Sequence, residues 1–375
     1  GGGLLKIGTD QHNTFDTMTM DCWNDRVYYE GKEFPAGQFA AEILNFAGVI
    51  HDPLLERITV LTALVDDLST AEKSKRHDIA AQLKPLLHDT VSWLYTCPPF
   101  CYCESQGAYE DLEHALSEER LDRDYEEGEA HLPYLALFFC EPILRILVAI
   151  YNFCLLIRAF EMKYLRRLKR RNADAFAKAA HECFDEDDSF LNLLEQMPFG
   201  GVEEFFSYPR VITGFKYFQD ENDEKKWKTA QRVICKRAID FYVFDLMNGL
   251  HHGHAPSQCQ GCGKYFLTTN GHIPKYCDGI APQDNRYTCR QYGAMMHQKE
   301  QNKQHPVYRL FTTRTDTIRK HHQRGKISDD LRREALYLAG SYRDKALMDN
   351  DYAADGYARD MELEHIYAEA EKRLK

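Results

Sequence analysis

Four cysteines between residues 257 and 293 are the strongest constraint on how this chain folds. Cys259 and Cys262 form a C-x-x-C-G turn, and Cys277 and Cys289 follow after fourteen and eleven intervening residues. The segment is polar and punctuated by Gly and Pro, so it offers little core in which four unrelated thiols would be buried. Four thiolates at ~2.3 Å around Zn²⁺ complete a tetrahedral site with no position left for a catalytic water. We therefore expect one structural zinc ion, bound by Cys259, Cys262, Cys277 and Cys289.

The other cysteines indicate a reducing compartment. The chain has twelve cysteines, and no signal peptide is recognised in its first residues. Cys140, Cys154 and Cys235 lie in apolar stretches, where a cysteine behaves as a small hydrophobic residue. We expect a cytoplasmic protein in which a tight cysteine cluster binds metal. A thioredoxin-type redox pair is disfavoured, because that motif does not need Cys277 or Cys289.

Charge is distributed unevenly along the chain. The net charge is −11. Residues 258–326 contain twelve Lys or Arg and four Asp or Glu, which gives +8 and leaves −19 for the rest. Zinc with four thiolates adds about −2 to this region, which stays basic. This asymmetry predicts an acidic body that carries a basic head.

The head resembles a known type of zinc finger. The pattern "CQGCGKYFL…KYC…TCRQYGA" is similar to the treble-clef-like finger of the CGNR type, and closer to uncharacterised bacterial proteins, often from mobile elements, with C-x-x-C-G-x-x-F…Y-C…C-R-x-x-G-A. The similarity also covers "VYYEGKEFPAG" and "RGKIS". The chain departs from the CGNR pattern after Cys289, where it reads Arg290-Gln291-Tyr292. The resemblance implies a mostly helical body and a nucleic-acid-binding head.

Basic residues in and after the finger form the predicted nucleic-acid interface, because phosphate backbones reward cationic surfaces through counterion release. A helix opened by Pro306 and ended by Gly325 is expected to turn Tyr308, Phe311, Thr315 and Ile318 inward. Arg309, Lys320 and Arg324 are expected to project from another face. The predicted contacts are Lys264, Lys275, Arg286, Arg290, Lys299, Lys303, Arg309, Arg314, Arg319, Lys320, Arg324 and Lys326. Whether the ligand is DNA or RNA stays open.

The fold class predicted is mainly α, with a small N-terminal β-hairpin and a C-terminal zinc-bound finger followed by helices. The expected divisions are residues 1–35 with the hairpin, 36–250 as the acidic helical body, 251–326 as the basic finger and following helix, and 327–375 as C-terminal helices.

Three stretches of the body carry specific expectations. Residues 223–250 are predicted to form one long amphipathic helix. The apolar stretch 132–160 contains Glu141, Pro142 and two arginines, so a buried helical pair hinged near Pro142 is favoured over a membrane span. The run "KYLRRLKRR" (163–171) is explained equally well by a helix C-terminus that favours positive charge and by a phosphate-contacting patch.

Other clusters are weaker candidates. His251, His252 and His254 precede the finger and could replace a cysteine ligand, although such a run is usually a solvated helix end. Cys97, Cys101 and Cys103, with His88, could form a second metal site, but their spacing matches no common knuckle. No Walker loop, G-x-S-x-G or H-E-x-x-H motif occurs, so we expect no enzymatic activity.

Two functions follow from the residues. The leading hypothesis is a regulatory or mobile-element-associated zinc-finger protein that binds nucleic acid. The alternative is a protein-interaction module or inhibitor in which zinc only shapes a docking surface, and the acidic stretch Glu104–Glu129 mimics nucleic acid. Eleven acids against two arginines make that stretch a solvated surface in the simplest interpretation.

Overall fold

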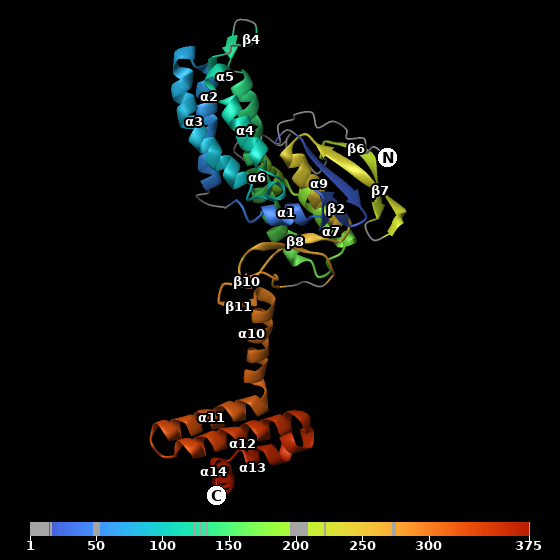
Figure 1. Cartoon of the computed structure of the whole chain (residues 1–375). Helices are drawn as coiled ribbons and strands as arrows, with labels where there is room; N and C mark the ends of the chain where they lie inside the picture. Colours follow the sequence, from blue (N-terminus) through green and yellow to red (C-terminus); the bar gives the residue numbers. More distant parts are fainter. Residues whose placement is uncertain are drawn as a thin grey trace. The chain divides into compact units, whose positions relative to one another are not determined.

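The computed structural model describes Phe15 and residues 17–47, 53–122, 125–127, 130–132, 134–195, 209–220, 223–271 and 275–374. The chain divides into two compact units, residues 1–277 (unit 1) and 278–375 (unit 2) (Figure 1). Helices predominate in both units, which confirms the mainly α class.

Unit 1 contains an antiparallel sheet built from two parts of the chain that are far apart in sequence. In the order β3-β2-β1-β7-β6, its strands are β1 (Met18–Trp23), β2 (Arg26–Tyr29), β3 (Lys32–Pro35), β6 (Val211–Asp220) and β7 (Asp223–Cys235). The predicted hairpin is confirmed in β2 and β3. Its two-residue turn has positive φ angles at Glu30 (46°) and Gly31 (72°), which matches the right-handed twist of the flanking strands.

The long helix predicted over residues 223–250 is wrong in its first half. This stretch is β7 followed by α9 (Ala238–His251). Val233 and Cys235 are buried and lie opposite Met20 and Met18 of β1. Pairing with the distant strand β1 thus buries every second side chain of this part of β7. This strand periodicity prevails over the helical spacing of apolar residues on which the prediction rests.

The helices of unit 1 pack beside this sheet and on one another. They are α1 (Gln38–Ile43), α2 (Pro53–Thr70), α3 (Lys73–Leu94), α4 (Gln106–Ala115), α5 (Glu118–Asp122), α6 (Tyr134–Lys163), α7 (Ala173–Phe184), α8 (Asp188–Glu195) and α9, with 3-10 turns η1 (Phe100–Tyr102) and η2 (Leu165–Arg167). A small hairpin, β4 (Tyr125–Glu127) and β5 (Ala130–Leu132), follows α5. In Figure 1, α2 and α3 lie side by side, and α6 contacts both α2 and α9.

The apolar stretch forms one helix, not the predicted pair. Pro142 lies inside α6, and the residues after it, including Ile143, Leu147 and Ile150, are fully buried. This packing holds the helix together although proline removes one backbone hydrogen bond. By length and composition, the segment Phe139–Arg167 passes the test for a membrane span, but 61% of its most apolar window is buried inside the protein. A core helix gives the same signal.

The core of unit 1 is rich in aromatic side chains and encloses the carboxylate of Asp245. Asp245 of α9 is fully buried and accepts hydrogen bonds from the backbone N–H groups of Gly37 and Ala40, both at 2.9 Å, at the start of α1. This contact needs α1 and α9 to touch: a Cβ on Gly249 would lie 2.8 Å from the Cα of Gly37. The polar and steric contacts together fix α1 on α9.

The acidic stretch is structured in the residues described. α4 and α5 bury Ala108, Leu112 and Leu121 against neighbouring helices. Their acids, among them Glu110 and Glu118, are exposed. The stretch is therefore an amphipathic, solvated surface of unit 1.

Unit 2 begins with a short hairpin, β10 (Ile280–Ala281) and β11 (Asp284–Thr288), and continues as helices. These are α10 (Cys289–Gln304), α11 (Pro306–Gln323), α12 (Asp329–Met348), the π-turn η3 (Tyr352–Gly356), α13 (Tyr357–Asp360) and α14 (Leu363–Leu374). Pro306 opens α11 and Gly325 follows its last turn, as predicted. Small residues such as Ala335 and Ala339 let α11, α12 and α14 approach closely, and Tyr357 donates a hydrogen bond to the Val307 carbonyl at 2.9 Å.

Candidate metal centre and basic surfaces

The first two cysteines lie in the tight turn of a hairpin. β8 (Ala255–Gln258) pairs with β9 (Tyr265–Thr268), so Gln258 lies opposite Tyr265. Across the turn, the N–H of Cys259 donates to the carbonyl of Lys264 (2.8 Å), and the N–H of Gly263 donates to the carbonyl of Cys259 (2.9 Å). These bonds place Cys259 and Cys262 on one side of the turn, in the geometry of a zinc knuckle.

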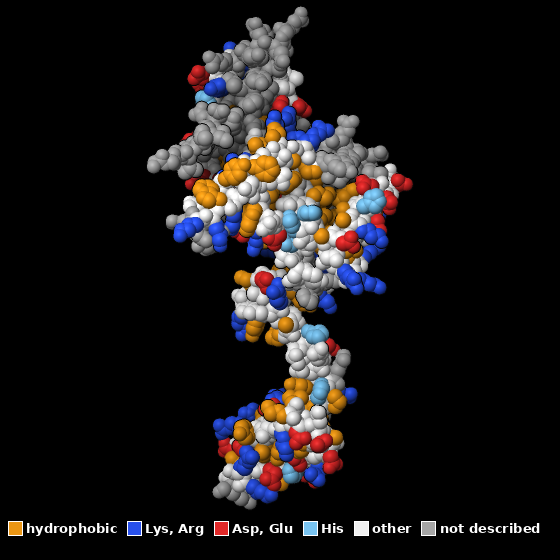
Figure 2. Space-filling view, turned by 90° about the vertical axis from the view of Figure 1, so that its right-hand side faces the viewer, with side chains coloured by type: hydrophobic (Ala, Val, Ile, Leu, Met, Phe, Trp, Pro, Cys, Tyr) orange, Lys and Arg blue, Asp and Glu red, His pale blue; other side chains and the backbone are white. Residues whose placement is uncertain are grey.

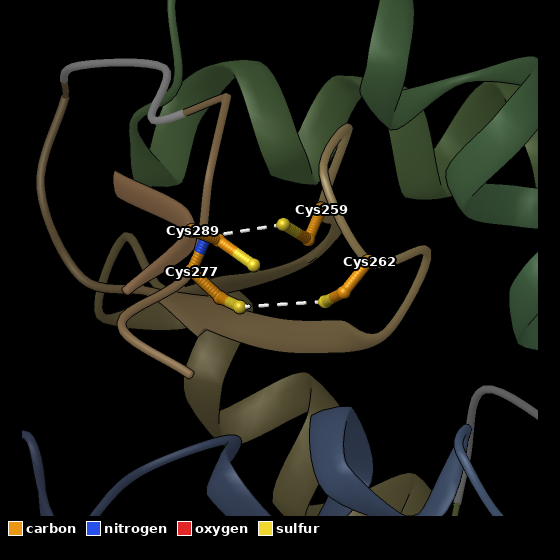
Figure 3. Close-up of side chains that lie close together, drawn as sticks. All are labelled: Cys259, Cys262, Cys277 and Cys289. Carbon is orange, nitrogen blue, oxygen red and sulfur yellow. Dashed lines mark hydrogen bonds between the residues drawn. The ribbon is translucent and has the colours of Figure 1, made fainter. Parts of the chain in front are cut away.

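The four predicted cysteines lie together. Their Sγ atoms are all within 4.8 Å of one another, and Figure 3 shows the four side chains converging on one point. The Sγ atoms of Cys262 and Cys277 are 3.6 Å apart, whereas bonds of ~2.3 Å in a tetrahedron give ligand separations of ~3.8 Å. The spacing thus fits four thiolates around one ion, and it excludes a disulfide between Cys262 and Cys277.

Backbone N–H groups prepare Cys259 for ionisation. Gly261 and Cys277 donate N–H bonds to its Sγ at 3.4 and 3.3 Å. Burial opposes ionisation of this thiol, but N–H groups from Cys277, Cys262 and Gly261 outweigh it and lower the pKa of Cys259 to about 7. A cysteine binds a metal ion as the thiolate. Because its lowered pKa favours the thiolate, Cys259 is prepared to bind a cation.

The fourth ligand starts a helix. Cys289 is the first residue of α10, and the N-cap residue Thr288 accepts a hydrogen bond from the N–H of Gln291, while the Gln291 side chain accepts one from the N–H of Thr288. The N–H of Cys289 donates to the Gly279 carbonyl at 2.7 Å. This capping box satisfies N–H groups of the first turn and positions the Cys289 thiol.

The weaker candidate ligands are not part of any such cluster. His254 is buried, and its Nδ1 lies 2.9 Å from the carbonyl of Ala36. The Cys103 thiol contacts the hydroxyl of Tyr29 at 3.3 Å, and His88 stacks on Tyr109. Among the described residues, the four-cysteine group is the one set of three or more His, Cys, Asp and Glu side chains close enough to hold an ion.

Several predicted nucleic-acid contacts are neutralised by neighbouring acids. Arg286 pairs with Asp284 (2.7 Å), Arg290 with Asp278 (3.0 Å) and Arg319 with Asp316 (3.0 Å). Arg314 is half-buried, and its Nε has no hydrogen-bond partner in the structure. The side chain of Lys303 lies outside the described residues. The three paired arginines therefore present less positive charge than the sequence suggests.

The other predicted contacts are exposed cations without an ion pair among the described residues. In unit 1 they are Lys264 and Lys275. In unit 2 they are Lys299, Arg309, Lys320, Arg324 and Lys326. On α11, Thr315 and Ile318 are buried, as predicted, whereas Tyr308 and Phe311 of the same predicted stripe are half-buried. Arg309 and Lys320 are exposed. Figure 2 shows Lys and Arg side chains interspersed with Asp and Glu around these helices, on the face drawn.

One pocket beside the knuckle was not predicted. It has a volume of about 380 Å³ and is lined by Asn45, Arg158, Gln258, Cys262, Gly263, Lys264 and Tyr265. Asn45 donates to the carbonyl of Tyr265 (3.0 Å) and accepts from its N–H (2.7 Å), and Arg158 lies over the Tyr265 ring at 5.6 Å. Asn45 and Arg158 belong to α1 and α6 regions far away in sequence, so no local pattern indicates their place here.

The comparisons with known proteins add one family match. Residues 207–373 match a family of unknown function (DUF6076). This range includes all four cysteines and most of unit 2. No curated protein and no solved structure matches the chain.

Proposed function

We propose that the four-cysteine cluster holds one structural Zn²⁺ and that the protein is a zinc-finger protein that binds nucleic acid. The observation that carries the proposal is the convergence of four thiols within 4.8 Å, with exposed Lys264 and Lys275 on the same segment. Four thiolate ligands fill a tetrahedral Zn²⁺ shell, so the ion would stabilise the fold and would not activate water.

The order of elements supports a treble-clef-like finger. A knuckle hairpin supplies two ligands, the loop after β9 supplies the third, and a hairpin leads to a helix whose first residue is the fourth ligand. Fingers with exposed cations commonly contact phosphates. The resemblance to bacterial mobile-element proteins supports a role in regulation or in a mobile-element process.

Binding is tested by fluorescence anisotropy with a short labelled DNA single strand, its duplex and the same sequence as RNA. We expect affinity to fall steeply with salt because released counterions drive the association. The variant R309E/K320E/R324E removes exposed cations of unit 2 and should weaken binding by roughly tenfold or more.

The control is K73E/K75E, which reverses two exposed cations of α3 that form no ion pair among the described residues. It should bind like the wild type if the interface is local to the basic surfaces. No binding by the purified, metal-loaded wild type at low salt would sink the proposal.

A second candidate is supported by the acids displayed on α4 and α5. Residues such as Glu110, Glu113 and Glu118 are exposed while the opposite side of these helices is packed. In that case a basic protein is the partner, and zinc shapes a docking surface. Purification at low salt distinguishes the two: co-purified nucleic acid supports the first function, and a stoichiometric protein partner supports the second.

A further inference from the structure

The run of six cations after α6 divides into anchoring and displayed residues. Lys163 pairs with Asp187 at 2.6 Å. Arg166 binds the buried carboxylate of Glu161 at 2.7 Å and the side chain of Gln258 at 2.9 Å. Glu161 lies in the last turn of α6, so this pair stays at the helix end. Asp187 and Gln258 belong to other parts of unit 1, so a favourable interaction with the end of α6 accounts for only part of this arrangement.

The far end of the run is anchored on the same hairpin. Arg171 is buried, and its guanidinium donates to the carbonyls of Leu165 (3.3 Å) and Pro256 (3.1 Å). Burial lowers the pKa of Arg171 from its ordinary value. Since Gln258 and Pro256 both lie on β8, the segment 166–171 is attached to the knuckle hairpin at its two ends.

The cations between these anchors face solvent. Arg167, Lys169 and Arg170 are exposed, and none forms an ion pair with any part of the chain that the structure describes. A short segment fixed at both ends loses little backbone entropy when it binds a ligand. Three unpaired cations in six residues, held in place, are therefore a prepared site for a polyanion.

The pocket beside the knuckle adds positive charge to this surface. Gln258, which holds Arg166, lines the pocket together with Arg158 and Lys264. One amino group of Arg158 donates to the carbonyl of Leu44. No acid among the described residues forms an ion pair with Arg158, so its positive charge at the pocket is available to an anion. The buried carboxylate of Glu161 is already matched by Arg166.

We propose that segment 166–171 and the adjoining pocket form a phosphate-binding surface of unit 1, which holds the sugar-phosphate backbone of a nucleic acid. This inference rests on the proposed function and adds to it a contact surface that joins Lys264 to residues of unit 1 outside the predicted finger contacts. Arg167, Lys169 and Arg170 contact successive phosphates, and Arg158 and Lys264 hold one phosphate at the pocket. Backbone contacts of this kind give affinity without sequence preference.

The test uses the full-length, metal-loaded protein and the same labelled DNA and RNA probes. The variant R167E/K169E/R170E should bind roughly tenfold more weakly or worse, and the slope of log affinity against log salt should become less steep by about three. K264E should weaken binding less. The α3 variant K73E/K75E is the control. Metal content and thermal unfolding should not change, because the three replaced side chains are exposed.

The outcomes separate this inference from the proposed function. If the wild type binds the probes and R167E/K169E/R170E binds as tightly as the α3 control, the phosphate surface is wrong while the proposed function stands. If the wild type binds no nucleic acid, the proposed function itself fails. Equal weakening by the α3 variant would show a general charge effect and would also overturn the inference.

Discussion

The aromatic core of unit 1 and the four-cysteine cluster are both buried, but they depend on opposite physical effects. Tyr242 is fully buried; its ring centroid lies 5.4 Å from that of Phe153 and 5.6 Å from that of Phe241. Such a core gains free energy from apolar area removed from water. The thiolates of the cluster repel one another, and only a bound cation makes their proximity favourable. Treatments that remove metal should therefore distinguish the two regions.

The largest effect is expected from replacing Cys259 by Ser. The apparent binding free energy of a structural zinc is about 10–16 kcal/mol, and most of it is lost with one ligand. Elemental analysis should show loss of the ion, and hydrogen exchange should show loss of protection over residues 255–289. The exposed Cys101 provides the control C101S, which should keep the metal. A C259S protein with full metal content and unchanged exchange would contradict the comparison.

A smaller effect, confined to the other region, is expected from Tyr242→Ala. The cavity left by a large aromatic side chain costs about 3–5 kcal/mol. Tyr242→Phe should cost about 1–2 kcal/mol, because it removes only the hydrogen bond to the Pro98 carbonyl (2.6 Å). Urea unfolding of the two variants and the wild type measures both differences in the free energy of unfolding. Metal content should stay at the wild-type level, and its loss in Y242F would show that the two regions are not independent.

A graded effect, which changes with pH, is expected from Asp245, a buried carboxyl group that belongs to neither the metal site nor the aromatic contacts. Burial raises the pKa of Asp245 from 3.8 to about 7. The backbone N–H groups of Ala40, Gly37 and Phe39 oppose this shift, but burial outweighs them. Between these values the folded state keeps a proton that the unfolded state has released, so the free energy of unfolding falls as pH rises, by about 1.4 kcal/mol per pH unit.

Asp245→Asn cannot titrate and should lack this slope. Urea unfolding of the wild type, D245N and the exposed control D66N at about pH 5 and about pH 7 measures it. The wild type and D66N should both lose stability toward the higher pH relative to D245N. Equal pH dependence of all three proteins would show that Asp245 is ionised throughout this range.

The features predicted correctly from the sequence are those set by neighbouring residues. The Glu30-Gly31 turn and the two ends of α11, at Pro306 and Gly325, each depend on a few adjacent positions. The four-cysteine cluster was also predictable, because only a common ligand gives meaning to thiols in a polar segment. The intervals between the four cysteines, on which that prediction rests, can be read directly from the sequence.

What the sequence did not indicate depends on distant contacts. β7 was predicted as helix because its apolar residues fit either period, and pairing with β1, more than 200 positions earlier, decides between them. The role of Arg166 and Arg171 depends on Gln258 and Pro256 of β8. In the same way, Asn45 reaches the knuckle only because α1 is docked on α9.

That docking leaves no space at one point. Where Gly249 meets Gly37, even a methyl group would collide with the opposite backbone. Asn45 follows α1 and forms hydrogen bonds with both the N–H and the carbonyl of Tyr265. A displacement of α1 would therefore also shift the turn that carries Cys259 and Cys262. The alignment of the four cysteines thus depends on Gly249, whose side chain is a single hydrogen atom and which lies in a helix that supplies none of the thiols.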